Sequence, residues 1–418
     1  MLPAVPQPEE ELRRHHGWKI TLPLALAAPL PATAARFDLI HTSLVVETVL
    51  FGVAIMGAAF LLAWAAEVAQ KDISQTLAIA VLAFIAVLPE YAVDLYFAFC
   101  AGQGDEACVS RAVANMTGAN RLLIGIGWAA VVLIYWLKSG KREVTLRRAQ
   151  RTDVGFLLIA TLWAFTIPLR RQLSLIDLGV LGTLFVAYIL RAAREEVEEP
   201  ELIGAAAAIG SLATRPRRVL TVLLFVYAAT AILGSAEPFA EGLVDIGERF
   251  GIEEFLLIQW LAPLASESPE MIIAILFTLR LKAQAGLGTL ISSKVNQWTL
   301  LVGTLPLVYS IAGAGFTTAL PMDARQVEEV FLTAAQSLFA IAVIANLSIS
   351  RAEAVALMVL FLGQFGFQAP EVRYGFAIAY LILAIAMFAA NREVRESLID
   401  SVRHVFRRRR PPPAGPGS

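Results

Sequence analysis

The chain has few of the residues that build disulfide frameworks and thiolate or imidazole metal sites. It contains two cysteines and four histidines among 418 residues. Two cysteines exclude a disulfide framework and a cysteine-rich metal site. Cys100 and Cys108 are close enough in sequence to form one bridge, and two free thiols are the alternative. The histidines lie at the chain ends or beside loops, so the sequence predicts a protein that is not an enzyme.

Charged residues are also scarce. They make up 17% of the chain, whereas hydrophobic residues make up 57% and the mean hydropathy is +0.67. A soluble domain of this length is far less apolar. The composition therefore predicts an integral membrane protein in contact with the lipid bilayer, and no nucleic-acid partner is expected.

Long apolar stretches dominate the sequence, and most are long enough to cross a bilayer as a helix. The first is short and irregular, because it contains Pro23, Pro29 and Pro31. We predict an all-α integral membrane protein with about 12 transmembrane helices. The stretches cover residues 20–35, 45–67, 74–101, 111–137, 153–169, 174–192, 219–240, 255–281, 286–313, 327–347, 352–368 and 372–390.

Ten of these stretches form two repeats of five helices, at residues 43–192 and 218–368. An odd number of spans forces the second copy to face the opposite way, so the repeats are predicted to be inverted. The remaining segments are an N-terminal segment with a peripheral helix at 1–42, a cytoplasmic linker at 193–217, an extra C-terminal helix at 369–391 and a basic, Pro-rich tail at 392–418.

Basic residues are distributed unevenly between the loops. With both termini in the cytoplasm, the inside segments hold 25 of the 34 lysines and arginines. Cytoplasmic loops carry such an excess. We therefore expect cytoplasmic termini. The short linker, without a large insert between the two halves, favours a bacterial inner (plasma) membrane.

Residues 261–270, LAPLASESPE, place Glu267 and Glu270 one turn apart inside an apolar stretch. A carboxylate in the bilayer is costly, at about 3 kcal/mol on insertion scales. Pro269 removes a helical hydrogen bond and is expected to break the helix. Residues 82–90 contain a second copy that ends in Pro89-Glu90. Two broken helices that each carry a Pro-Glu pair predict the two halves of an ion site.

Each Pro-Glu pair belongs to a longer motif. Residues 86–90 read AVLPE and residues 114–123 read ANMTGANRLL; residues 266–270 read SESPE and residues 288–297 read GTLISSKVNQ. These segments resemble the G-T-S-x-P-E and G-N-x-x-G-S-N-x-x-N motifs of the cation/calcium antiporter superfamily, which includes the sodium/calcium and proton/calcium exchangers. The two motif regions span residues 82–127 and 261–303. The resemblance implies that Glu90 and Glu270 are the paired calcium ligands.

The chain departs from the family pattern in its first repeat. The resemblance places sodium ligands at eight positions, four in each repeat. In the second repeat they are polar: Ser266, Glu267, Ser293 and Gln297. In the first repeat they offer no side-chain oxygen: Ala86, Val87, Ala119 and Leu123.

Oxygen-rich residues near the two motifs form the expected cation-binding set, because calcium prefers six to eight oxygen ligands. The set is Glu90, Glu270, Glu267, Asp94, Asn115, Asn120, Ser266, Ser293 and Gln297. Its four carboxylates, together with Arg121 and Lys294, have a formal charge of −2, which one divalent cation or two protons or sodium ions would neutralise. Alternatively, Glu90 and Glu270 are protonated or ion-paired and serve only in packing.

Arg121 and Lys294 are predicted either to compensate the negative charge of the acidic residues or to take part in the coupling of transport. Lys294 either pairs with Glu90 or Glu270 and leaves when the ion enters, so that its proton is the counter-ion, or it extends out of its helix towards the membrane surface. Arg121 is expected to be a structural partner of Asp94 or Glu90, because a guanidinium keeps its proton.

These features predict a secondary antiporter that exchanges calcium or a related cation for protons or sodium by alternating access. Its partners are then inorganic cations, it needs no covalently bound cofactor, and a homo-oligomer is left open. The alternative is a transport-incompetent homologue, a membrane scaffold or regulator in which Lys294 and Arg121 occupy the ion site.

Overall fold

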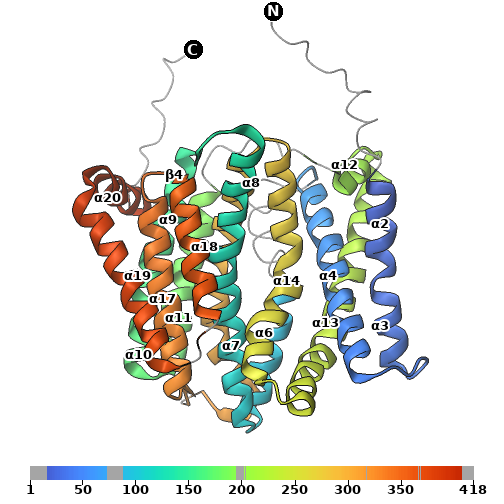
Figure 1. Cartoon of the computed structure of the whole chain (residues 1–418). Helices are drawn as coiled ribbons and strands as arrows, with labels where there is room; N and C mark the ends of the chain where they lie inside the picture. The colour runs from blue at the N-terminus through green and yellow to red at the C-terminus, as the bar shows by residue number, and fades with distance from the viewer. Residues whose placement is uncertain are drawn as a thin grey trace, which may run out of the picture.

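The described part of the computed structural model comprises residues 17–72, 88–193, 202, 204–316, 318–365, 367 and 369–406. It is a bundle of helices with two short sheets (Figure 1). In the first predicted repeat the helices are α4 (Leu44–Ala69), α6 (Leu88–Gly102), α7 (Glu106–Leu122), η1 (Leu123–Trp128), α8 (Ala129–Ser139), η2 (Arg148–Gln150), α9 (Arg151–Ala164), α10 (Thr166–Arg170) and α11 (Leu175–Ala192).

The second predicted repeat has a corresponding series of helices. They are α13 (Thr214–Phe250), α14 (Glu254–Leu279), α15 (Ala283–Asn296), η3 (Gln297–Leu301), α16 (Val302–Tyr309), η4 (Ser310–Ala314), α17 (Ala324–Ile344) and α18 (Arg351–Phe365). The helices outside the two repeats are α2 (Trp18–Ala27), α3 (Pro29–Arg36), α12 (Gly204–Gly210), α19 (Pro370–Ala390) and α20 (Arg392–Phe406).

Within the described residues, each predicted apolar stretch falls mainly on a helix or a run of helices. Residues 74–87, 366 and 368 of these stretches lie outside the described part. In that part, seven helices are long and apolar enough to cross a membrane, or eight if the bent helix α14 counts as one span. The sequence predicted about twelve. Several of the remaining stretches form short or composite helices, such as α2 with α3 or α15 with η3 and α16, and these are shorter individually than a bilayer is thick.

Two short antiparallel sheets join the two halves of the chain. Strand β1 (Glu143–Thr145) pairs with β4 (Ser348–Ser350), and β2 (Gln172–Leu173) pairs with β3 (Leu320–Pro321). The strands β1 and β3 follow the third predicted span of their halves, and β2 and β4 follow the fourth. Strand β1 of the first half therefore corresponds to β3 of the second, and β2 corresponds to β4. If the two halves were exchanged, the sheet β1–β4 would take the place of the sheet β2–β3.

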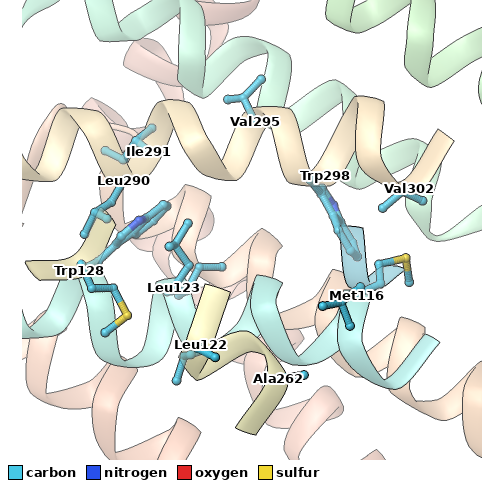
Figure 2. Close-up of a cluster of buried hydrophobic side chains, with 14 of the residues drawn as sticks. Met116, Leu122, Leu123, Trp128, Ala262, Leu290, Ile291, Val295, Trp298 and Val302 are labelled. Carbon is cyan, nitrogen blue, oxygen red and sulfur yellow. The ribbon is translucent and has the colours of Figure 1, made fainter. Parts of the chain in front are cut away.

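The central helices pack antiparallel, since α15 contacts η1 while α7 contacts η3. Figure 2 shows Trp128 beside Leu290 at one end of this contact and Trp298 beside Met116 at the other. Both tryptophan side chains are buried. These apolar contacts hold together the two helices that follow the Pro-Glu motifs.

The predicted linker and tail both contain helices. Helix α12 lies within residues 193–217 and contacts α4. Residues 392–406, which we expected to belong to a tail, form α20 instead. This helix packs on α9, where Gly155 lets it approach so closely that a Cβ atom there would meet Ser401 and Val405. The predicted tail from residue 407 onward lies outside the described residues.

Candidate functional site

Four acidic side chains from the two halves of the chain come together near the Pro-Glu motifs. Glu90 and Asp94 project from α6, and Glu267 and Glu270 project from α14, which contacts α6. Glu90, Asp94 and Glu267 are buried, whereas Glu270 is partly exposed. The Glu90 carboxyl group interacts electrostatically with the other three. The structure therefore places Glu90 and Glu270 within electrostatic range of each other, on helices in contact.

Glu90 and Glu267 face each other's charge across the two halves. Their carboxyl groups interact electrostatically. Among the described residues, neither Glu90 oxygen accepts a hydrogen bond from an amide or hydroxyl donor. Two neighbouring buried carboxylates are costly unless a proton or a cation compensates their charge. This pair is suited to exchanging a proton for a metal ion.

The helix that follows each motif supplies amide partners for the acids. Asn115 Nδ2 on α7 donates to Asp94 Oδ1 at 3.0 Å. In the second half, Gln297 Nε2 donates to Glu267 Oε1. An amide that donates to a carboxylate leaves its own carbonyl oxygen for a cation, and the Asn115 and Gln297 oxygens are buried without a protein donor among the described residues.

The two predicted serines differ in what they contact. Ser293 on α15 lies beside the Glu270 carboxyl group. The Ser266 hydroxyl donates to the backbone oxygens of Ala262 and Pro263 in its own helix, both at 3.3 Å. Ser293 is thus the serine hydroxyl that is in contact with an acidic side chain.

A sharp bend separates the two acidic residues of α14. The helix axis turns by 53° between Glu267 and Glu270, at the position of Pro269. The sequence predicted a break here, because a proline inside a helix removes a hydrogen bond. The corresponding segment before Glu90 lies outside the described residues, as do Ala86 and Val87.

Lys294 is fully buried and does not extend towards the membrane surface, so that alternative is wrong. Its Nζ atom donates to Asn120 Oδ1 at 2.5 Å and to the Asn120 backbone oxygen at 3.3 Å. It also lies 4.4 Å from the centre of the Trp298 ring. The ion pairs found among the described residues do not include Lys294, although Glu90 and Glu267 interact with it electrostatically. The ammonium group therefore lies next to the acids without being fixed to one of them.

Arg121 does not pair with Asp94 or Glu90, and that expectation is wrong. Its guanidinium forms a 2.6 Å ion pair with Glu329 on α17 and donates to Gln364 at 3.1 Å. One residue along a helix turns the side chain by about 100°, so Arg121 faces α17 while Asn120 faces Lys294. Without Arg121, the four carboxylates and Lys294 have a formal charge of −3.

The sequence reasoning missed the buried ion cluster to which Arg121 belongs. Arg373, from α19, pairs with Glu328 at 2.9 Å and also with Glu329. All four charged side chains are at most 5% exposed. Two adjacent glutamates at the start of an apolar stretch were a signal for this cluster, as was the single arginine at the start of α19.

Close backbone contact brings the motif helices together. A Cβ atom at Gly118 of α7 would overlap the backbone oxygen of Gln259 in α14. At Gly286 of α15 it would overlap the backbone oxygen of Ala274, again in α14. Membrane helices approach closely at such small residues. These glycines let both helices that carry the amide partners lie directly against the bent helix α14.

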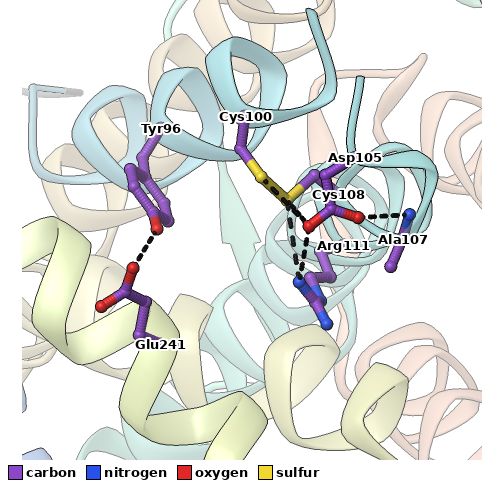
Figure 3. Close-up of a disulfide and its surroundings, with 7 residues drawn as sticks. All are labelled: Tyr96, Cys100, Asp105, Ala107, Cys108, Arg111 and Glu241. Carbon is purple, nitrogen blue, oxygen red and sulfur yellow. Dashed lines mark hydrogen bonds and ion pairs between the residues drawn. A yellow bond between two sulfur atoms is a disulfide. The ribbon is translucent and has the colours of Figure 1, made fainter. Parts of the chain in front are cut away.

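A disulfide between Cys100 and Cys108 joins the end of α6 to the first turns of α7 (Figure 3). The Asp105 side chain caps α7 by accepting from Ala107 N at 2.9 Å. In the same region, Tyr96 donates to Glu241 of α13 at 2.7 Å (Figure 3). Of the two alternatives for the cysteines, the structure shows the bridge.

Comparison with known proteins gives one family and several related structures. The sequence model of the family described as "Sodium/calcium exchanger protein" matches residues 43–193 and 220–369. These ranges begin and end within two residues of the predicted repeats. No curated protein matches the chain.

Among solved structures, the crystal structure of the H+/Ca2+ exchanger CAX is 45% identical in sequence, with a TM-score of 0.89 over 94% of this chain and 98% of that one. The structure of native YfkE is 17% identical, with a TM-score of 0.58 over 87% of this chain and 100% of its own. The sodium-calcium exchanger NCX_Mj is 17% identical, with a TM-score of 0.52 over 79% and 100%. These matches confirm the predicted superfamily and the predicted all-α membrane fold.

Proposed function

The chain belongs to the sodium/calcium exchanger family, and we propose that it is a secondary antiporter that exchanges calcium or a related cation for protons or sodium. The H+/Ca2+ exchanger CAX, at 45% identity over nearly the whole of both chains, supports calcium as the cation. As an antiporter the protein performs transport and not an enzymatic reaction.

The observation that carries this proposal is that buried acidic side chains from opposite halves of the chain, Glu90 on α6 and Glu267 on α14, lie on helices in contact and interact electrostatically. Buried carboxylates are costly unless a cation or a proton compensates them. In our proposal, calcium displaces protons held by the acidic side chains and binds to oxygens of Glu90 and Glu270, with Glu267, Asp94 and the nearby amides completing the set.

Two features favour protons over sodium as the counter-ion. The positions of Ala119 and Leu123, where the family resemblance implies sodium ligands, offer no side-chain oxygen. The carboxyl pair and Lys294 are groups that can each release a proton. A calcium ion that enters would neutralise two charges, and release of two protons would balance it.

Alternating access needs two halves that move relative to each other around the site. We propose that residues 43–192 and 218–368 are these halves, in inverted orientation. Two observations support this arrangement. The strands of the two sheets correspond when the halves are exchanged, and the family model matches each half separately. The disulfide then lies on the outer side of the membrane, where disulfides persist.

The test is uptake of radioactive calcium into proteoliposomes that contain the purified full-length chain. An outward-directed proton gradient is expected to drive uptake, and Glu270→Gln is expected to abolish it. Arg392→Gln, at an exposed position of α20, is the matched control and should transport like the wild type. Uptake that needs a sodium gradient instead would identify sodium as the counter-ion.

A second candidate is a homologue without transport, and burial of Lys294 beside the acids favours it. A permanent ammonium would then replace the metal ion. Arg121 gives this reading no support, because it faces Glu329. Lack of uptake under every gradient, for calcium and for other divalent or monovalent cations, would establish this reading over the antiporter.

A further inference from the structure

We propose that a basic cavity at one end of the bundle binds a phosphate group, either of an anionic lipid or of a soluble anion. The cavity has a volume of about 890 Å³ and lies between the end of α8, strand β1 and the start of α15. Four basic residues line it, with one acidic residue among them: Lys141, Arg142, Arg147, Lys282 and Glu143. The net positive lining favours an anion.

The start of α15 adds to the positive potential of this cavity. Ala283, Gln284 and Ala285, the first residues of the helix, line the same space. Within the described part of the chain, the N-cap residue of this helix makes no side-chain capping hydrogen bond. The N-terminus of a 14-residue helix carries a partial positive charge and presents amide donors, which suits a phosphate oxygen.

The walls of the cavity are fixed by contacts between the two halves of the chain. Val144 of β1 is paired with Ile349 of β4. The Arg351 amide donates to the Arg142 backbone oxygen at 2.7 Å. Lys138 donates to the Leu279 backbone oxygen at the end of α14. The basic side chains therefore project from a built frame, which distinguishes this site from a charged surface loop.

The position of the cavity makes both sources of phosphate accessible. It lies at the end of the bundle where β4, α12 and α20 are found (Figure 1). With the predicted topology this end faces the cytoplasm, where soluble phosphates are present. Basic pockets between transmembrane helices on this side also bind lipid head groups. The proposal goes beyond the transport function, because neither Lys141 nor Arg142 contacts the acidic site.

The test measures binding and does not depend on transport. Equilibrium dialysis with radiolabelled inorganic phosphate, on the full-length protein in neutral detergent, tests the soluble source. Native mass spectrometry after incubation with phosphatidylglycerol or phosphatidylcholine tests the lipid source. The variant Lys141→Gln/Arg142→Gln removes two exposed charges from the cavity. The control Arg392→Gln/Arg403→Gln removes two charges from α20, where the side chains are 82% and 76% exposed.

The wild type and the control are expected to bind phosphate, or to retain phosphatidylglycerol over phosphatidylcholine, at one site per chain. The cavity variant should bind about 30-fold more weakly. This factor is the contribution expected from two basic residues that attract an anionic group at a membrane surface. Retention of phosphatidylglycerol without binding of free phosphate would assign the site to a lipid. Equal binding by the cavity variant and the control, or no binding by the wild type in either assay, would overturn the proposal.

Discussion

The Lys294 ammonium donates a hydrogen bond to Asn120 Oδ1 at 2.5 Å, and these two residues occupy matching positions of the two repeated motifs. They are 174 residues apart. The same separation relates Leu123 to Gln297, the residues at which the π-helical turns η1 and η3 begin. Turns of this kind are frequent at functional sites. The two motif helices therefore meet at equivalent residues, and a lysine has taken the place of one of two asparagines.

Removal of the Lys294 charge should tighten calcium binding. In Lys294→Met the ammonium no longer repels a dication beside Glu90 and Glu267, and we expect a roughly ten- to hundredfold lower dissociation constant. Calorimetry on the purified protein at low ionic strength measures it. Lys294→Arg keeps a charge that does not deprotonate, so it should bind calcium no better than the wild type. An unchanged affinity in Lys294→Met would show that the lysine is not coupled to the ion.

Glu329→Gln should strongly destabilise the bundle without any change at the acidic site. The substitution leaves Arg121 and Arg373 buried with one carboxylate, Glu328, between them. Loss of one member of a buried ion pair costs about 3–5 kcal/mol. Thermal unfolding in detergent measures the effect. Glu371→Gln, at an exposed position of α19, is the control and should unfold like the wild type. Equal unfolding temperatures for the two variants would contradict the structural role of the cluster.

Reduction of the disulfide should loosen the connection between α6 and α7. Cys100 and Cys108 close a loop with a sequence separation of 8. The chain-entropy estimate for such a loop is about 2.5 kcal/mol. The unfolding temperature of the wild type should therefore fall with a reducing agent. The double variant Cys100→Ser/Cys108→Ser should begin at the lower value and show no response. A wild-type protein insensitive to the reductant would indicate that the bridge does not stabilise these helices.

The meeting of the acidic residues could be predicted because the sequence repeats its rarest features. A Pro-Glu pair inside an apolar stretch is costly, and two copies at matching positions pointed to Glu90 and Glu270. The amide partners were also within reach of the sequence, since Asn115 and Gln297 lie in the helices that follow the motifs. Both elements of the prediction depend on local pattern and repetition.

The partners towards which the buried basic side chains point could not be predicted in the same way. Asn120 and Arg121 are neighbours in sequence, yet a helix turns one towards Lys294 and the other towards Glu329. Glu329, which neutralises Arg121, belongs to a span of the second repeat. Arg373, the other arginine of the cluster, belongs to a helix outside both repeats. Such contacts are set by tertiary packing, and the helix at residues 392–406 depends likewise on its docking against α9.

The central claim is that carboxylates from both halves bind one ion. Equilibrium calcium binding by the wild type, Glu90→Gln, Glu270→Gln and the double variant tests it most directly. Each single substitution should weaken binding by about 100-fold or more. The double substitution should cost clearly less or more than the sum, because the two residues share a ligand. Wild-type affinity in either single variant, or strictly additive losses, would contradict a shared ion site.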